Sequence, residues 1–245
     1  MALSKSRRVL LKLSGEALGD PQRGTPLDLN RIRALAEQIA EAARQGARIA
    51  IVIGGGNLWR GGREAGLELD RSISDVMGML GTVMNTVALG QTLKQLGAPA
   101  RAMSAIGPSP WVERYEIARA RRALDAGEIV LIGGGTSNPF FTTDSAAALR
   151  ALELEVDLLL KATNVDGVYN ADPKQDPSAT LYTELTFDEA IERQLRVMDT
   201  AAFSLCADGD IPIFVFNMTR PRGILEALLG EGPGTRVERE ASTSC

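Results

Sequence analysis

Residues 131–147 read LIGGGTSNPFFTTDSAA, and this stretch decides the predicted fold. It begins inside the apolar run 128–132, EIVLI, which is typical of a buried strand. The three glycines at 133–135 predict a tight turn, and TTDS at 142–145 predicts the start of a helix. A strand, a glycine turn and a helix N-terminus place free backbone N–H groups at the carboxyl edge of a sheet, where they form an anion site.

The polar side chains of this stretch suit a ligand. The hydroxyls and the amide of residues 136–143 are uncharged donors, and the carboxylate of Asp144 could orient cations. A glycine turn followed by an ordinary Thr/Asp helix cap has the same pattern. Both interpretations stay open on this stretch alone.

A second predicted strand of the chain also runs into a turn of three glycines. Residues 51–57, IVIGGGN, match residues 130–136, VLIGGGT, and glycine lets the backbone approach a phosphate closely. Two such turns at strand ends predict sites for two phosphate groups. Neither turn fits GxGxxG, so the dinucleotide fingerprint is absent. Arg60 follows the first turn at a distance suited to closing over a phosphate, although a plain surface arginine is the alternative.

Two lysines end apolar strands. Lys12 lies in VLLKL at 9–13, and Lys161 ends VDLLLK at 156–161. Because a core disfavours lysine, we expect both to emerge at the carboxyl edge of the sheet, where open α/β sheets bind ligands. For Lys12, a position on an edge strand facing solvent is the alternative.

About eight predicted strands alternate with helices, which indicates one three-layer α/β/α domain with a mostly parallel central sheet. We place this domain at residues 8–238, with an acceptor half to about 150, a nucleotide half from 151, and a disordered tail at 239–245. A methionine-rich helix is predicted from Asp75 to about Leu96, and we assign it to the core or to a subunit interface.

Composition excludes several classes of function. The chain has no histidine, which removes Ser-His-Asp and Cys-His catalysis. The chain has only two cysteines, Cys206 and Cys245, and no CxxC or Cys/His cluster, so we expect no zinc site and no protein-bound metal. A structural disulfide is not expected, because Cys245 is the last residue of a polar tail. The net charge is −4, and the basic run 5–8 is predicted to lie in a solvated tail, so no nucleic acid is expected. Without a predicted signal peptide or an apolar run of about 20 residues, we expect no membrane and a cytoplasmic location.

These residues suit phosphoryl transfer, a reaction that depends on positioning and charge neutralisation. Lys12, Arg60 and Lys161 would offset charge on the moving phosphoryl group. Asp144 would hold the lysines in place and, indirectly, Mg²⁺.

A family resemblance supports this chemistry. The chain resembles the bacterial uridylate kinases of the amino acid kinase superfamily in VLLKLSG (9–15), VIGGGNLWRG (52–61), DVMGMLGTVMN (75–85), NPFFTTDSA (138–146), LKATNVDGVY (160–169), ADP (171–173) and VMDTAAF (197–203). The motifs come in the family's order, from about residue 8 to 238. The first glycine motif indicates only the superfamily, whereas NPFFTTDSA with ATNVDGVY is specific to the uridylate kinases.

The resemblance implies the reaction ATP + UMP → ADP + UDP in pyrimidine nucleotide synthesis, with Mg²⁺ held mainly by the ATP phosphates. It implies a catalytic set of Lys12, Arg60, Asp144, Lys161 and Asp199. It implies ATP contacts from Lys12, Leu13, Ser14, Gly15, Gly56, Arg60, Thr163, Asn164, Tyr169 and Asp172. It implies UMP contacts from Gly55, Asp75, Thr136, Ser137, Asn138, Pro139, Phe140, Phe141, Thr142 and Thr143.

The family forms homohexamers that GTP commonly activates and UTP inhibits. Here the loop after the first strand reads GDPQRGTPLD at 19–28 in place of a glycine-rich segment linked to the GTP response, so the resemblance leaves that response open. Two other functions remain as alternatives. One is a kinase of the same fold that phosphorylates a carboxylate or carbamate, and the other is a non-catalytic nucleotide sensor.

Overall fold

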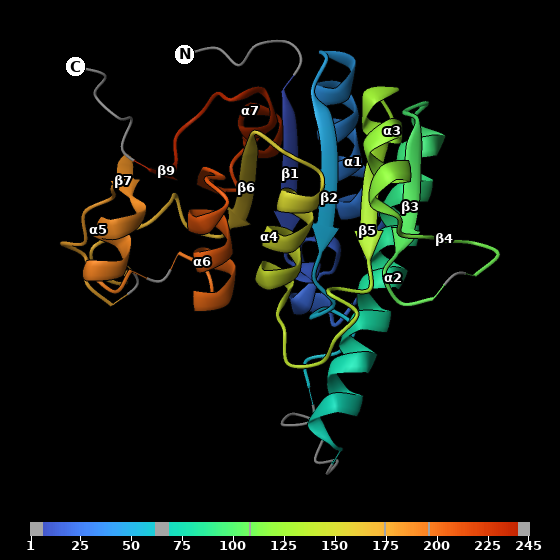
Figure 1. Cartoon of the computed structure of the whole chain (residues 1–245), viewed down its shortest axis with the longest axis horizontal. Coiled ribbons are helices and arrows are strands. Elements are labelled where there is room, and N and C mark those ends of the chain that lie inside the picture. Colours follow the sequence, from blue (N-terminus) through green and yellow to red (C-terminus); the bar gives the residue numbers. More distant parts are fainter. Residues whose placement is uncertain (1–6, 62–68, 108, 174, 196, 240–245) are drawn as a thin grey trace.

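The computed structural model describes residues 7–61, 69–107, 109–173, 175–195 and 197–239. These residues form one sheet in the order β4-β3-β5-β2-β1-β6-β8-β9-β7 (Figure 1). The strands are β1 (Arg8–Leu13), β2 (Arg48–Ile53), β3 (Ala100–Ser104), β4 (Glu113–Arg114), β5 (Ile129–Gly133), β6 (Leu158–Thr163), β7 (Glu184–Thr186), β8 (Ile213–Asn217) and β9 (Thr235–Glu238).

All strand pairs are parallel except β8 with β9, which is antiparallel. The strands of residues 8–150 form one side of the sheet and the later strands form the other, and they meet where β1 pairs with β6. The predicted α/β class with a mostly parallel sheet is therefore confirmed.

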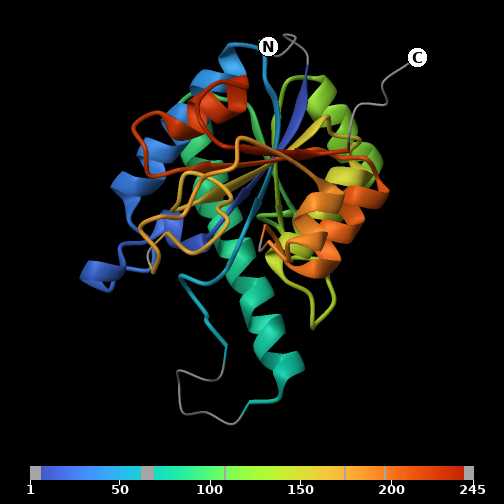
Figure 2. The same ribbon diagram turned by 90° about the vertical axis from the view of Figure 1, so that its left-hand side faces the viewer.

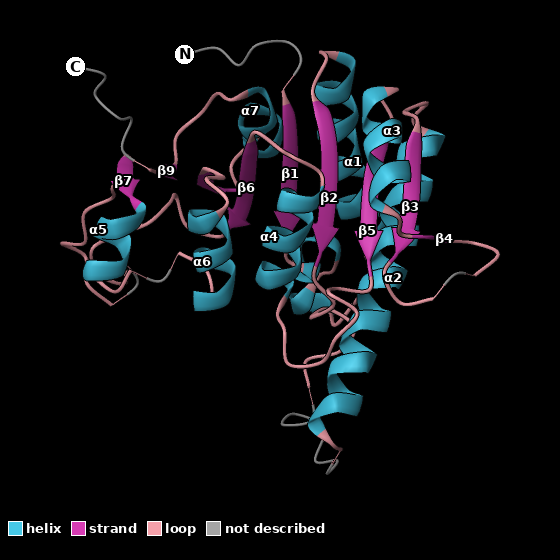
Figure 3. Cartoon of the chain, in the orientation of Figure 1, coloured by secondary structure: helices cyan, strands magenta, loops and turns pink. Residues whose placement is uncertain are grey.

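Helices cover both faces of the sheet (Figures 2 and 3). The helices are α1 (Leu29–Arg44), α2 (Arg71–Gln95), α3 (Ile117–Asp125), α4 (Thr143–Glu153), α5 (Phe187–Glu192), α6 (Thr200–Asp208) and α7 (Gly223–Leu229), with short 3-10 turns η1 (Gly15–Leu18) and η2 (Pro21–Arg23). One core cluster joins the sheet to α1, α2 and α7, and the other joins it to α3, α4 and α6. The result is the predicted three-layer arrangement.

Side-chain alternation along β1 decides where Lys12 points. Val9, Leu11 and Leu13 belong to the core cluster on the α1 face, whereas Leu10 belongs to the cluster on the α4 face. Successive side chains of a strand point to opposite faces, so Lys12 shares the face of Leu10. The same alternation in β6 puts Lys161 on the face of Leu159.

Helix α2 starts earlier than the sequence predicted. It begins at Arg71, and the carboxylate of Asp70 accepts a hydrogen bond from the Ser72 N–H at 2.8 Å as the N-cap. The prediction that the helix begins at Asp75 is therefore wrong, because a second acidic residue just upstream does the capping. By length and composition alone α2 could cross a membrane, but the core helix of a soluble protein passes the same test.

Two terminal regions refine the predicted boundaries. Arg8 opens β1 and its guanidinium pairs with Asp125 at 2.6 Å, so the predicted basic tail does not extend to this residue. At the other end, Arg239 donates to the Ala207 carbonyl at 2.7 Å. Residues 1–6 and 240–245 lie outside the described residues, and with them Cys245.

Candidate active site

The lysines of β1 and β6 meet at one carboxylate. The prediction that Lys161 ends its strand is wrong, because β6 continues to Thr163. Lys12 on β1 and Lys161 on β6 are register partners on adjacent strands. Lys12 Nζ lies 2.7 Å from Asp144 Oδ1, and Lys161 Nζ lies 2.8 Å from Asp144 Oδ2. Asp144 sits in the first turn of α4, which begins directly after the second glycine turn. Two cations thus stand side by side, held by one carboxylate between them.

Burial strengthens the charge–charge interactions within this cluster. The side chains of Lys12, Asp144 and Lys161 are 14%, 14% and 15% exposed. Burial acts to raise the pKa of Asp144, but the two ammonium groups outweigh it and hold that pKa below its ordinary value of 3.8. Burial lowers the pKa of Lys161 below 10.5; the charge of Lys12 adds to this, while Asp144 and Asp199 oppose it.

The segment 197–199 contacts both Lys161 and helix α4, which carries Asp144. Lys161 Nζ donates to the Val197 carbonyl at 2.5 Å. Asp199 caps α6 by accepting from the Ala202 N–H at 2.9 Å, and its carboxylate also accepts from the hydroxyls of Thr142 and Ser145. Because Thr142 is the N-cap of α4, Asp199 ties the helix that carries Asp144 to the start of α6, while the Val197 carbonyl two residues earlier contacts Lys161 of β6. Asp199 touches neither lysine directly in the described contacts.

The first glycine turn packs tightly against the end of β1. A side chain at Gly15 would place its Cβ 2.5 Å from the Gly54 carbonyl oxygen, so only glycine fits. The amide of Asn85 on α2 donates to the Gly54 carbonyl at 2.7 Å and exchanges hydrogen bonds with the Asn57 amide. This amide pair fixes the turn, and the sequence analysis did not identify it because α2 is distant in sequence.

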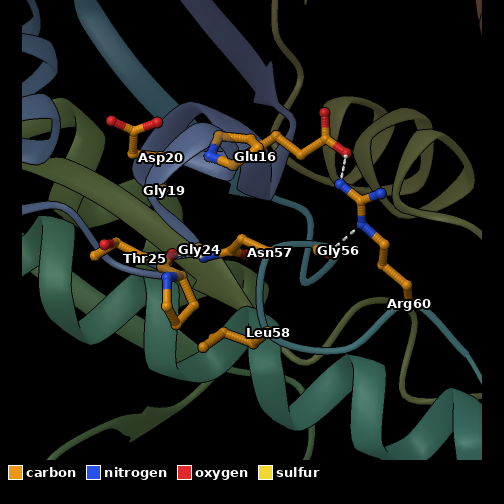
Figure 4. A pocket seen from close by; sticks show the side chains of 11 residues that line it. Glu16, Gly19, Asp20, Gly24, Thr25, Gly56, Asn57, Leu58 and Arg60 are labelled. Carbon is orange, nitrogen blue, oxygen red and sulfur yellow. Dashed lines mark hydrogen bonds and ion pairs between the residues drawn. The ribbon is translucent and has the colours of Figure 1, made fainter. Parts of the chain in front are cut away.

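Arg60 leaves this turn and folds back over it. Its Nε donates to the Gly56 carbonyl at 3.1 Å, and its Nη2 lies 2.6 Å from Glu16 Oε1 (Figure 4). The two side chains are 48% and 40% exposed. Glu16 was not predicted as a site residue, although its place one residue after Gly15 was a usable signal.

Two cavities flank Arg60. We call the first the acceptor cavity, because several of the residues predicted to contact the acceptor line it. It has a volume of about 440 Å³ and is lined by Gly55, Gly56, Trp59, Arg60, Gly61, Ser74, Asp75, Gly78, Met79, Thr82, Gly135, Thr136, Asn138, Phe141, Thr142 and Thr143. We call the second the loop cavity; it has a volume of about 320 Å³ and is lined by Glu16, Gly19, Asp20, Pro21, Gly24, Thr25, Pro26, Gly56, Asn57, Leu58 and Arg60 (Figure 4).

The second glycine turn supplies one wall of the acceptor cavity. Asp75 on α2 holds the loop that follows this turn. Asp75 Oδ2 accepts a hydrogen bond from the Phe140 N–H at 2.8 Å, which joins α2 to the loop before α4. Of the predicted substrate residues, Ser137, Pro139 and Phe140 are absent from the lining. Ser137 and Phe140 instead adopt positive φ angles of 68° and 71°, which shape the loop.

The predicted nucleotide residues lie beyond Lys161. Thr163 ends β6, and its hydroxyl donates to the Val165 carbonyl at 2.7 Å. The chain then makes an excursion in which Tyr169 pairs with Leu181 as an antiparallel bridge. Asn164 and Asp172 lie on this excursion. The structure thus groups these residues on the β6 side of the lysine cluster, while the acceptor cavity lies on the β2 and β5 side.

Comparison with known proteins finds similar folds over nearly the whole chain. Residues 7–217 match the model of the amino acid kinase family. The crystal structure of UMP kinase from Bacillus anthracis is 38% identical, with a TM-score of 0.91, covering 96% of this chain and 97% of that chain. UMP kinase from Ureaplasma parvum is 36% identical, with a TM-score of 0.90, and the match covers 96% of this chain and 99% of that one.

A more distant solved structure extends the likeness. Uridylate kinase from Archaeoglobus fulgidus is 28% identical, with a TM-score of 0.69, covering 94% of this chain and 99% of that chain. The family model covers most of the chain, and two solved structures exceed 35% identity over nearly the whole length. The chain therefore belongs to the amino acid kinase family.

Proposed function

We propose that this protein is a nucleoside monophosphate kinase that transfers the γ-phosphoryl group of ATP to UMP, giving ADP and UDP for pyrimidine nucleotide synthesis. The observation that carries the proposal is the cluster in which Asp144 holds Lys12 and Lys161 beside the acceptor cavity. Phosphoryl transfer needs charge neutralisation at a fixed point between donor and acceptor. The similarity to solved UMP kinases supports UMP as the acceptor.

The catalytic roles follow from the chemistry of each group. Lys12 and Lys161 stabilise charge on the transferred phosphoryl group, and Arg60 neutralises phosphate beside the first glycine turn. Asp144 orients both ammonium groups, and Asp199 acts as a positioning residue through α4. A phosphate of UMP is already an anion at neutral pH, so the transfer needs no general base.

On the acceptor side, UMP would occupy the acceptor cavity. The proposed UMP contacts are Gly55, Asp75, Thr136, Ser137, Asn138, Pro139, Phe140, Phe141, Thr142 and Thr143, with Asp75 on the ribose. Most of these line the cavity, which offers hydroxyl and amide groups suited to a uracil edge.

On the donor side, ATP would lie across β1, β6 and the excursion after β6. The proposed ATP contacts are Lys12, Leu13, Ser14, Gly15, Gly56, Arg60, Thr163, Asn164, Tyr169 and Asp172. The division of the sheet at the β1–β6 pair supports an acceptor half at residues 8–150 and a nucleotide half at 151–238.

Mg²⁺ is proposed to bind mainly through the ATP phosphates. Within the part of the chain that the structure describes, no group of three or more His, Cys, Asp or Glu side chains could form a ligand set. Both oxygens of Asp144 face lysines, so its carboxylate acts on the metal only indirectly. When bound, the ion would supply further neutralisation of the β- and γ-phosphates.

We further propose a cytoplasmic homo-oligomer, in keeping with the family's hexamer, with GTP and UTP as candidate effectors. Exposed apolar side chains form one stripe along α2, consisting of Ile73, Val76, Leu80, Met84 and Val87. Their spacing of three or four residues keeps them on one helix face. A contiguous apolar face of this kind supports assembly through α2.

The test is ADP release from Mg·ATP with a panel of acceptors: UMP, CMP, dUMP, AMP, N-acetylglutamate, aspartate and carbamate, each with and without GTP. We expect strong turnover with UMP. Turnover with a carboxylate or carbamate alone would move the chain to the acyl-phosphate-forming kinases. Nucleotide binding without turnover on any acceptor would identify a nucleotide sensor.

A further inference from the structure

Arg60 stands between two cavities, and its partner Glu16 lies on the far one. Arg60 and Gly56 line both the acceptor cavity and the loop cavity, whereas Glu16 lines the loop cavity and not the acceptor cavity. The ion pair therefore holds the guanidinium end beside Glu16, a residue of the loop cavity (Figure 4).

The pair engages the edge of the guanidinium that is best suited to a phosphate. Arg60 binds the Gly56 carbonyl through Nε and Glu16 through Nη2. The Nε and Nη2 groups form one side of the planar fork, which can make two parallel hydrogen bonds to a carboxylate or phosphate. A phosphate in the acceptor cavity can use this edge only after Glu16 and the carbonyl release it.

We propose that Glu16 is a positioning residue that competes with the phosphate of the acceptor for Arg60 and so sets the affinity of the acceptor. This inference rests on the proposed function, because it takes a nucleoside monophosphate as the ligand of the acceptor cavity. It also assigns Arg60, proposed above as an ATP contact, to the phosphate of that acceptor, because Arg60 lines the acceptor cavity. Glu16 itself makes no contact with the substrate in this role.

The exposure of the pair makes the exchange feasible. Both side chains are close to half exposed, and ion pairs of this kind are weak because water and salt screen them. The backbone of Glu16, in contrast, is fixed: it lies in η1, where its N–H donates to the Ser14 hydroxyl at 3.4 Å. The carboxylate therefore stays near the glycine turn and recaptures Arg60 when the acceptor leaves.

The competition lowers ground-state affinity without changing the reacting groups. Removing it should tighten acceptor binding by about two- to fivefold, the range for releasing an exposed ion pair. Because this binding energy is shared by the ground state and the transition state, the KM for UMP should fall while kcat stays near its normal value.

The test is calorimetric titration of UMP, without ATP, into the full chain and four variants. These are Glu16→Gln, Arg60→Ala, the double variant, and Glu37→Gln as a control. Glu37 forms a comparable exposed pair with Arg33 on α1, at 3.0 Å. Thermal unfolding of each variant checks that it is folded, and the KM for UMP replaces the Kd where titration heats are too small.

We expect Glu16→Gln to lower the Kd for UMP about two- to fivefold, Glu37→Gln to leave it unchanged, and the gain to vanish in the Arg60→Ala background. An unchanged or larger Kd in folded Glu16→Gln would overturn the inference. An equal gain without Arg60 would also overturn it, because the negative charge of Glu16 would then repel the phosphate of UMP directly, without acting through Arg60. Failure of the unaltered chain to bind UMP would instead remove the proposed function, and this inference with it.

Discussion

Lys12 and Lys161 are register partners across the β1–β6 pair, and both ammonium groups reach the single carboxylate of Asp144. Adjacent parallel strands place register partners on the same face of a sheet. The two lysines are 149 positions apart in sequence (161 − 12), yet the sheet fixes their spacing more firmly than a loop could. The same pair lies where the two halves of the sheet meet.

Replacing Lys161 should affect catalysis more than stability. We expect Lys161→Met to reduce kcat about 100-fold or more, because one donor to the transition-state charge is lost. Asp144 keeps Lys12 as a partner, so the fold should persist. Steady-state kinetics and thermal unfolding measure the two effects, with the exposed Lys94→Met as a control. Near-normal turnover in Lys161→Met would remove its assignment to phosphoryl transfer.

The carboxylate of Asp144 should make stability depend on pH in acid. Its folded pKa lies below the ordinary 3.8, so it contributes stability that is present above 3.8 and lost as pH falls through the folded value. We therefore expect the stability difference between the unaltered chain and Asp144→Asn to shrink as pH falls below 3.8. Urea unfolding midpoints across this range measure it. A difference that stays constant would show that ionisation of Asp144 does not stabilise the fold.

Asp199 should act on the lysine through charge. It raises the pKa of Lys161 against the lowering effect of burial, so its removal should lower that pKa further. Asparagine is also a good N-cap, so Asp199→Asn should keep α6 capped. We expect kcat to fall in alkali as Lys161 loses its proton, because burial holds its pKa below 10.5, and we expect this fall to begin at lower pH in the variant.

The pH–rate profile of Asp199→Asn measures this shift, with Asp208→Asn at the end of the same helix as the control. A purely structural role would reduce kcat equally at every pH. An unmoved alkaline limb would therefore contradict the electrostatic link between Asp199 and Lys161.

Asp75 should matter for the acceptor and not for the donor. Its carboxylate holds the Phe140 N–H and lines the acceptor cavity. We expect Asp75→Asn to weaken UMP binding about tenfold, the order of one charged hydrogen bond, and to leave ATP binding unchanged. Separate titrations with each nucleotide measure this, with the exposed Asp210→Asn as control. An unchanged Kd for UMP would reject the ribose role.

The apolar stripe of α2 should be an interface between copies of the chain. We expect Leu80→Glu to shift the protein to smaller species in light scattering, because a charge would be buried in the contact. Leu29→Glu is the matched control, since Leu29 is also exposed but lies at the start of α1. An unchanged mass for Leu80→Glu would place the interface elsewhere.

The sequence by itself determined the layers and the elements that carry the site. Local signals sufficed for this: apolar runs predict the buried strands, triple glycines mark the turns, and TTDS marks the start of α4. The unusual placing of Lys12 and Lys161 in apolar strands also pointed to the carboxyl edge, because burial of an unpaired lysine is unfavourable. The strand of Lys161 was nevertheless predicted to end too early, since β6 continues to Thr163. The start of α2 was misplaced because Asp70 and Asp75 are both competent caps by sequence.

Only the tertiary structure decided which groups touch. The sequence predicted that Asp144 would hold the two lysines, but not how it reaches them. Register in the β1–β6 pair and the side of the sheet that α4 covers bring Asp144 between the lysines, and both depend on strand order. The link from Asp199 to Ser145 and the pairing of Glu16 with Arg60 join residues from separate elements. Such contacts leave no periodic trace in a single sequence, because pairing between distant segments is set by the packing of the whole sheet.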